Sequence, residues 1–157
     1  MTKLFLSLHV LAAIVAIGPV TVAASMFPAI SRRALGDSDD RDAHTTMQTL
    51  HRICRAYACV GIAVPVLGFA TASSLGVLGD AWLITSILLT SVAAGVLALL
   101  ILPAQDRALA ATAGAASPSP EPPWTPSRLA MVTGIFNVLW ATVTVLMIIR
   151  PGSTTGV

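Results

Sequence analysis

The sequence predicts an all-α membrane protein, a four-transmembrane-helix antiparallel bundle whose second helix extends into the cytoplasm. Of its 157 residues, 55% are hydrophobic and only 10% are charged, and the mean hydropathy is +0.84. Apolar residues also fall into long blocks bounded by charged residues instead of alternating with polar ones. Water-soluble domains have a different composition. We therefore expect residues 1–157 to form a single transmembrane domain.

Four stretches without Asp, Glu, Lys or Arg define the expected spans. A helix rises about 1.5 Å per residue, so about 20 apolar residues cross a hydrocarbon core of about 30 Å. The stretches place the spans at about 4–27, 56–78, 81–102 and 129–149.

Proline and acidic residues set the expected ends of the first two helices. Pro28 should disrupt the last turn of the first helix, which we expect to end near Phe27. The acidic run at 37–40 suits a helix N-terminus, and apolar residues follow it at helical spacing. We therefore expect one long second helix from about Asp40 to Leu78, kinked at Pro65.

The two remaining links differ in composition. Helices two and three are joined by little more than Gly79 and Asp80, which leaves room only for a tight antiparallel hairpin. Residues 104–127 are rich in Ala, Ser and Pro, which predicts a flexible loop.

Basic residues predict the orientation. Seven Lys and Arg residues flank the two longer loops, whereas Lys3 and Arg150 stand on the opposite side. The positive-inside rule then places both loops in the cytoplasm and both termini outside a bacterial plasma membrane. A cleavable signal peptide ending near residues 22–24 is the alternative. It would put the Arg-rich loop outside, so we favour a spanning first helix.

His9 is the titratable residue at membrane depth that invites a functional interpretation. Imidazole can bind haem or a metal, or it can hydrogen-bond to a hydroxyl on a neighbouring helix. We expect His9 to face the bundle interior, because acyl chains offer it no partner. Met147, a conventional haem ligand at similar depth, is the second candidate cofactor-binding residue. No catalytic residue and no metal site is predicted.

The second helix carries further residues with metal-binding side chains. Cys54 and Cys59 are five residues apart on one helix, so they point to different faces and neither a disulfide nor a redox pair is expected. His44, Met47 and His51 share one helical face. A soft-metal site and an interfacial helix with exposed histidines both fit, and we favour the latter because no thiolate or carboxylate has matching spacing.

Small and polar residues within the spans suggest how the helices pack. Gly68, Ala72 and Gly76 form a stripe that permits close approach of a neighbouring helix. Asn137 is expected to form an interhelical hydrogen bond, and Trp82 to lie at the membrane interface.

Three segments resemble a known family: LHVLAAIVAIGPV, RICRAYACVGIAVPVLGFAT and LMIIRPG. Together they resemble the DUF2269 group of predicted bacterial integral membrane proteins, which has no assigned activity, over nearly the whole chain. More distantly, the LHVLAA-type first helix is similar to copper-resistance protein D and to the HemJ-type protoporphyrinogen oxidase. In HemJ-like proteins a first-helix histidine is implicated in haem binding, which implies that role for His9. Unlike them, this chain has no lysine within its third helix.

These observations favour a membrane module without enzymatic activity, or an accessory subunit of a larger complex. Its expected partners are the lipid bilayer and either another membrane protein or a second copy in a homo-oligomer. A haem- or metal-binding redox protein using His9 is the alternative, and a small transporter or channel is the second. Transport ranks last because the spans contain no Asp, Glu, Lys or Arg. Nucleic acid is excluded as a partner, because there is no long basic run or aromatic platform.

Overall fold

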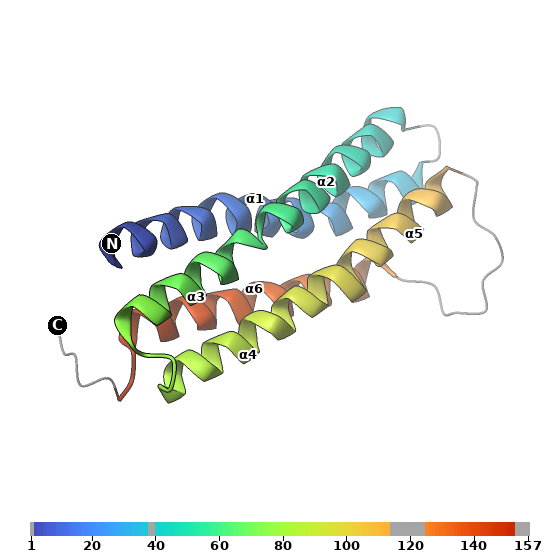
Figure 1. Ribbon diagram of the computed structural model, residues 1–157. Coiled ribbons are helices and arrows are strands. Elements are labelled where there is room, and N and C mark those ends of the chain that lie inside the picture. The colour runs from blue at the N-terminus through green and yellow to red at the C-terminus, as the bar shows by residue number, and fades with distance from the viewer. Residues whose placement is uncertain (1, 38–39, 114–124, 153–157) are drawn as a thin grey trace.

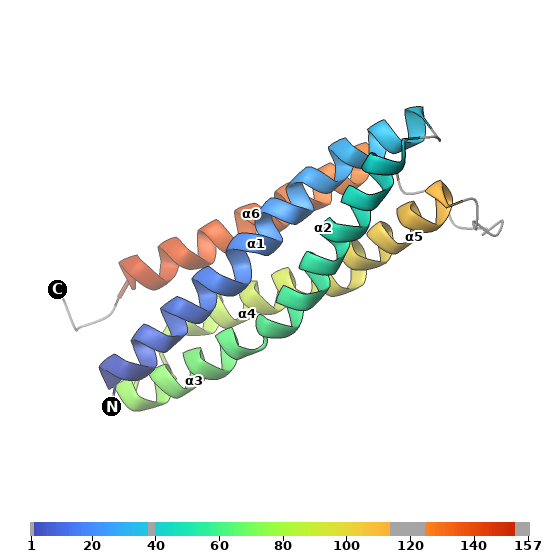
Figure 2. The ribbon, with the colours of Figure 1, turned by 90° about the horizontal axis from the view of Figure 1, so that it is seen from above.

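The computed structural model describes residues 2–37, 40–113 and 125–152, and every regular element in these ranges is a helix (Figure 1). Four helical segments are long and apolar enough to cross a membrane: Thr2–Gly36, Arg41–Leu75, Ala81–Thr112 and Pro126–Ile149. Each segment runs in the opposite direction to the one before it (Figures 1 and 2).

The four segments contain seven elements. The first is α1 (Thr2–Gly36), and the second consists of α2 (Arg41–Val60) and α3 (Ala63–Leu75). The third joins α4 (Ala81–Gly95), the π-helix η1 (Val96–Ile101) and α5 (Leu102–Thr112) into one rod, and the fourth is α6 (Pro126–Ile149). α1 packs along α2 and α3, whereas α4 packs along α6.

Helix α1 passes through its prolines, so the prediction that it ends near Phe27 is wrong. Pro19 and Pro28 both lie inside the helix, which continues to Gly36. Phe27, Pro28 and Ser31 are buried, so packing stabilises the turn that the missing N–H weakens. Neighbouring helices commonly make proline tolerable in apolar helices of this kind.

The second segment is interrupted where one long helix to Leu78 was predicted. The break falls at residues 61–62, and the helix ends at Leu75. Pro65 has no N–H to donate to the Gly61 carbonyl, which instead accepts a hydrogen bond of 3.1 Å from the Val64 N–H. Gly76 then ends the helix with a left-handed φ of 70°, which glycine adopts readily.

The start of α2 agrees with the predicted acidic N-terminus. The Asp40 carboxylate accepts a hydrogen bond of 2.9 Å from the Ala43 N–H and one of 2.6 Å from the Arg33 Nε. The Ala43 N–H and the nearby Arg33 guanidinium hold the pKa of Asp40 below its ordinary value.

Part of the predicted loop at 104–127 is helical, which corrects that prediction for residues 104–112. Alanine favours helix, and Pro103 is tolerated because it lies in the first turn of α5. Ala104 and Gln105 are fully buried, so this segment belongs to the core. Residues 114–124 lie outside the described part of the chain.

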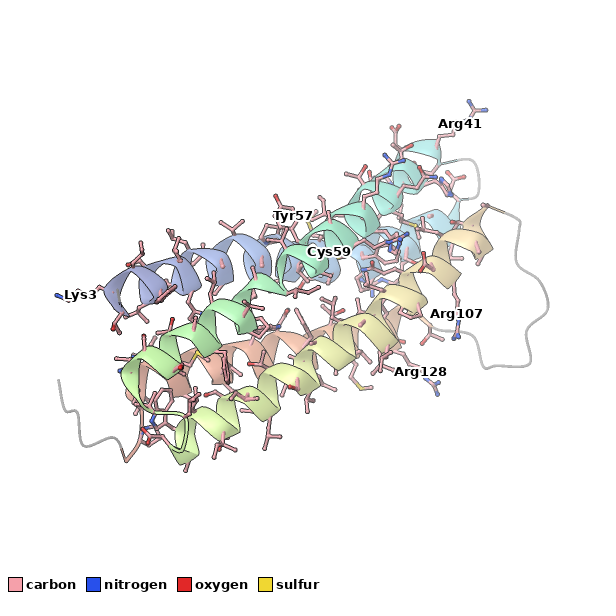
Figure 3. All side chains as sticks on the ribbon, viewed as in Figure 1. Lys3, Arg41, Tyr57, Cys59, Arg107 and Arg128 are labelled. Carbon is pink, nitrogen blue, oxygen red and sulfur yellow. The ribbon has the colours of Figure 1, made fainter. Side chains whose placement is uncertain are left out.

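Buried hydrophobic side chains divide unequally between the two ends of the molecule. The larger cluster includes Phe27, Met47, Ile101 and Phe136 and fills the half that contains α2, η1 and α5. We call this the Arg-rich half, because Arg41, Arg107 and Arg128 lie at its end (Figure 3). The smaller cluster comprises Ala72, Trp82 and Leu83. It belongs to the His9 half, which contains the start of α1, α3, the start of α4 and the end of α6.

Candidate functional site

The His9 half contains a cavity of about 1380 Å³, lined by α1, α3, α4, α6 and the residues that follow α6. It exists because α3 packs along α1 but has only sparse contact with α4 and α6. Its volume exceeds the roughly 300–1,000 Å³ of ordinary small-molecule pockets. The walls are mainly aliphatic and aromatic, so an occupant would be largely apolar.

His9 lies in the wall of this cavity and contacts α3. Its Nδ1 is 2.9 Å from the Val64 carbonyl oxygen. Since a carbonyl only accepts, Nδ1 is the donor of this hydrogen bond. The prediction that His9 faces the bundle interior is confirmed, because the ring contacts α3 and lines the cavity between the helices. Its partner is a backbone carbonyl and not a side-chain hydroxyl.

The hydroxyl groups expected near His9 have other partners. Each donates to a backbone carbonyl of its own helix at 2.8–2.9 Å. These residues are Thr71, Ser74, Thr85, Ser86 and Thr144. Such local bonds satisfy a hydroxyl in an apolar setting without any contact between helices.

Gly68 provides the space that the His9 ring occupies. A Cβ atom at position 68 would lie 2.9 Å from Cε1 of His9, closer than real Cβ contacts. The predicted small-residue stripe therefore serves separate purposes: Gly68 admits the imidazole, whereas Gly76 ends α3. Sequence reasoning identified both the histidine and the glycine but did not connect them.

Met147, the second predicted cofactor-binding residue, lines the same cavity as His9. It is partly buried and packs against the Ala72, Trp82 and Leu83 cluster. The structure therefore brings both candidate ligands to one cavity wall.

The mouth of the cavity carries a cluster that sequence reasoning missed. Trp82 Nε1 donates a hydrogen bond of 2.9 Å to Asp80 Oδ2. The Arg150 guanidinium lies over the Trp82 ring, with Cζ 5.5 Å from the ring centroid. This distance is typical of a cation–π interaction, which here joins the α3–α4 hairpin to the end of α6. In the sequence, Asp80 and Arg150 are single charged residues beside apolar stretches. Such residues indicate where a span ends, but they do not show which span ends lie close together.

A second polar cluster is buried in the Arg-rich half. His51 Nδ1 lies 3.0 Å from Gln105 Oε1, and Gln105 Nε2 lies 3.6 Å from Cys54 Sγ. His51 Nε2 is 2.9 Å from Asp106 Oδ1, within ion-pair distance although not aligned as a hydrogen bond. Both ring nitrogens thus lie close to acceptor oxygens of α5.

This cluster corrects the prediction of exposed histidines for His51, which is only 6% exposed. Its partner Gln105 lies on α5, where a loop was predicted. Among residues 2–37, 40–113 and 125–152, no three His, Cys, Asp or Glu side chains are grouped to hold a metal ion.

Two smaller predictions are confirmed. Asn137 Nδ2 donates a hydrogen bond of 3.0 Å to Ser25 Oγ, which joins α6 to α1. Cys54 and Cys59 are both free thiols, the first buried and the second exposed.

Comparison with known proteins finds one family. No curated protein and no solved structure matches the chain. The family model described as "Predicted integral membrane protein (DUF2269)" matches residues 3–151, which include α3, Arg150 and the cavity-lining residues other than Gly152. The chain therefore belongs to the DUF2269 family of predicted integral membrane proteins.

Proposed function

We propose that this protein is a multi-pass module of the bacterial plasma membrane that acts by binding, as an accessory component, and not by catalysis. The large cavity among four apolar helices carries this proposal. Several polar side chains within the helices support it, because they bond to backbone carbonyls or join helices. The component that it serves is another membrane protein or a second copy of the chain.

The proposed orientation places both termini outside. Arg41, Arg107 and Arg128 lie at one end of the molecule and Lys3 at the other (Figure 3). This separation of charge supports a cytoplasmic Arg-rich end.

Reporter fusions test the orientation. Alkaline phosphatase fused after Val157 should be active, and a fluorescent protein at the same place should stay dark. A fusion at Ala113, directly after α5, is the matched control and should show the reverse pattern. A glowing C-terminal fusion with inactive phosphatase would reject the orientation.

Haem or metal binding at His9 is the second candidate function, and one observation favours it. A ligating histidine usually donates its other ring N–H to a carbonyl or carboxylate, as His9 Nδ1 does to Val64. An imidazole and a thioether are donor types that haem iron takes, and His9 and Met147 line the same cavity. They would be the ligands of the iron. Bound haem would supply redox chemistry.

An absorption spectrum and metal analysis of detergent-purified protein separate the two candidates. The binding module predicts a colourless, metal-free sample. A Soret band that disappears in His9→Ala but remains in the control His44→Ala would establish the second candidate instead.

A further inference from the structure

We propose that the cavity of the His9 half holds an acyl chain of an anionic phospholipid, whose phosphate is bound by Arg150. This inference rests on the proposed membrane function and names the ligand class. It does not depend on orientation, because the lipid belongs to whichever leaflet contains the Asp80–Arg150 end of the bundle.

The interior of the cavity suits a flexible hydrocarbon chain. Its walls include large apolar side chains whose surfaces are not covered by other parts of the described chain: Val10, Ile14, Phe69, Leu75, Ile87 and Ile148. At 1380 Å³ the space is larger than compact ligands require. In a bilayer, the surrounding medium that can enter such a space consists of lipid chains.

The walls alone would not select one lipid over another. Lipid tails are as apolar as the helices, so moving a chain from the bilayer into the cavity changes its surroundings little. Selection must therefore come from a polar group at the cavity mouth, where a head group would lie.

Arg150 is that group. It lines the cavity directly after α6, and in the described ranges no carboxylate forms an ion pair with it. The nearby Asp80 carboxylate accepts the Trp82 indole N–H instead. The Trp82 ring packs against one face of the guanidinium. A guanidinium held in this way presents a planar fork of N–H donors, which matches two phosphate oxygens.

The arrangement favours a phospholipid over free phosphate. One partly exposed arginine would hold an isolated anion only weakly in water, where surface ion pairs contribute little. A chain anchored in the adjacent cavity keeps the phosphate beside the guanidinium and raises its local concentration. The apolar space and the cation are therefore expected to act together.

Native mass spectrometry of the full chain tests the inference, using phosphatidylglycerol and phosphatidylcholine with identical chains. The wild type should retain phosphatidylglycerol preferentially, and Arg150→Gln should reduce that preference about tenfold, the effect of losing one charge-assisted contact. Lys3→Gln removes the other cation of this end and should leave the preference unchanged. Ala13→Phe, which places a phenyl group in the cavity and narrows it, should reduce retention of both lipids.

Three results would overturn the inference: equal retention of both lipids by the wild type, an unchanged preference in Arg150→Gln, or full competition by inorganic phosphate. Circular dichroism checks that each variant is folded. If Ala13→Phe fails to fold, the lipid preference of Arg150→Gln still tests the inference. None of these results affects the reporter fusions, so failure of the lipid site is distinguishable from failure of the membrane module.

Discussion

The two halves of this molecule are built from parts of the same four membrane-spanning segments but pack differently. In the Arg-rich half, α2 and α5 close against α1, and Phe27, Met47 and Ile101 are fully buried. In the His9 half, α3 stays with α1 while α4 stays with α6, and a cavity separates the two pairs. Apolar composition therefore places helices in a membrane but does not determine how closely they pack. We infer that the Arg-rich half stabilises the fold and that the His9 half binds.

Truncation of one phenylalanine in each half should give the largest contrast. Phe27→Ala empties a site that is 0% exposed, whereas Phe69→Ala acts on a side chain that is 61% exposed. In soluble cores this substitution lowers the free energy of unfolding by about 3–5 kcal/mol. We expect a loss near the low end of that range for Phe27→Ala, because the unfolded chain also remains in lipid. Phe69→Ala should have little effect. Unfolding in mixed micelles, followed by circular dichroism, measures both, and equal losses would refute the division into halves.

Gln105→Leu should break the polar cluster of the Arg-rich half. It leaves Nδ1 of His51 without its partner in a buried position, which costs about 1–3 kcal/mol. Gln48→Leu, on the exposed side of α2, is the matched control. The same micelle assay applies. If the two substitutions have the same effect, the buried hydrogen bond contributes nothing measurable.

Gly68→Ala should have a smaller effect, centred on His9. The new Cβ forces the ring from its position against α3, and overpacking of this kind costs about 1–3 kcal/mol. We expect the low end, since the neighbouring cavity gives the ring room to move. A double-mutant cycle with His9→Ala measures the coupling. If the two substitutions have independent, additive effects, the contact between the His9 ring and Gly68 does not contribute to stability.

Acid should produce the smallest change, at the exposed start of α2. The pKa of Asp40 is lowered in the folded protein, so its carboxylate stabilises the cap at pH values above its unfolded pKa. That contribution is lost as the pH falls below about 4 and through the lowered folded value. Asp40→Asn keeps a capping side chain but does not titrate. Protection of the first turn of α2 against hydrogen exchange, corrected for the pH dependence of the intrinsic exchange rate, should depend on pH in the wild type and much less in Asp40→Asn.

Sequence reasoning predicted the features that depend on composition and missed those that depend on neighbours. Charge-free stretches located the four apolar segments, because charges are costly inside a membrane. Pro28 was misjudged because its effect depends on the packing around it. Gln105 was assigned to a loop on composition, which hid its pairing with His51. Arg150 and Trp82 are 68 positions apart in the chain, and no local pattern links them.

The π-helix η1 has a consequence for insertions and deletions in this family. A π turn accommodates one more residue than an α turn, so η1 equals a single-residue insertion in an otherwise regular rod. Removing one residue from Val96–Ile101 would therefore restore a regular α-helix and leave the faces of α4 and α5 in their present relation. The residue at the position of Gln105 would still meet His51. Family members one residue shorter in this segment should therefore have an α-helix in place of η1 and keep the same residue opposite position 51.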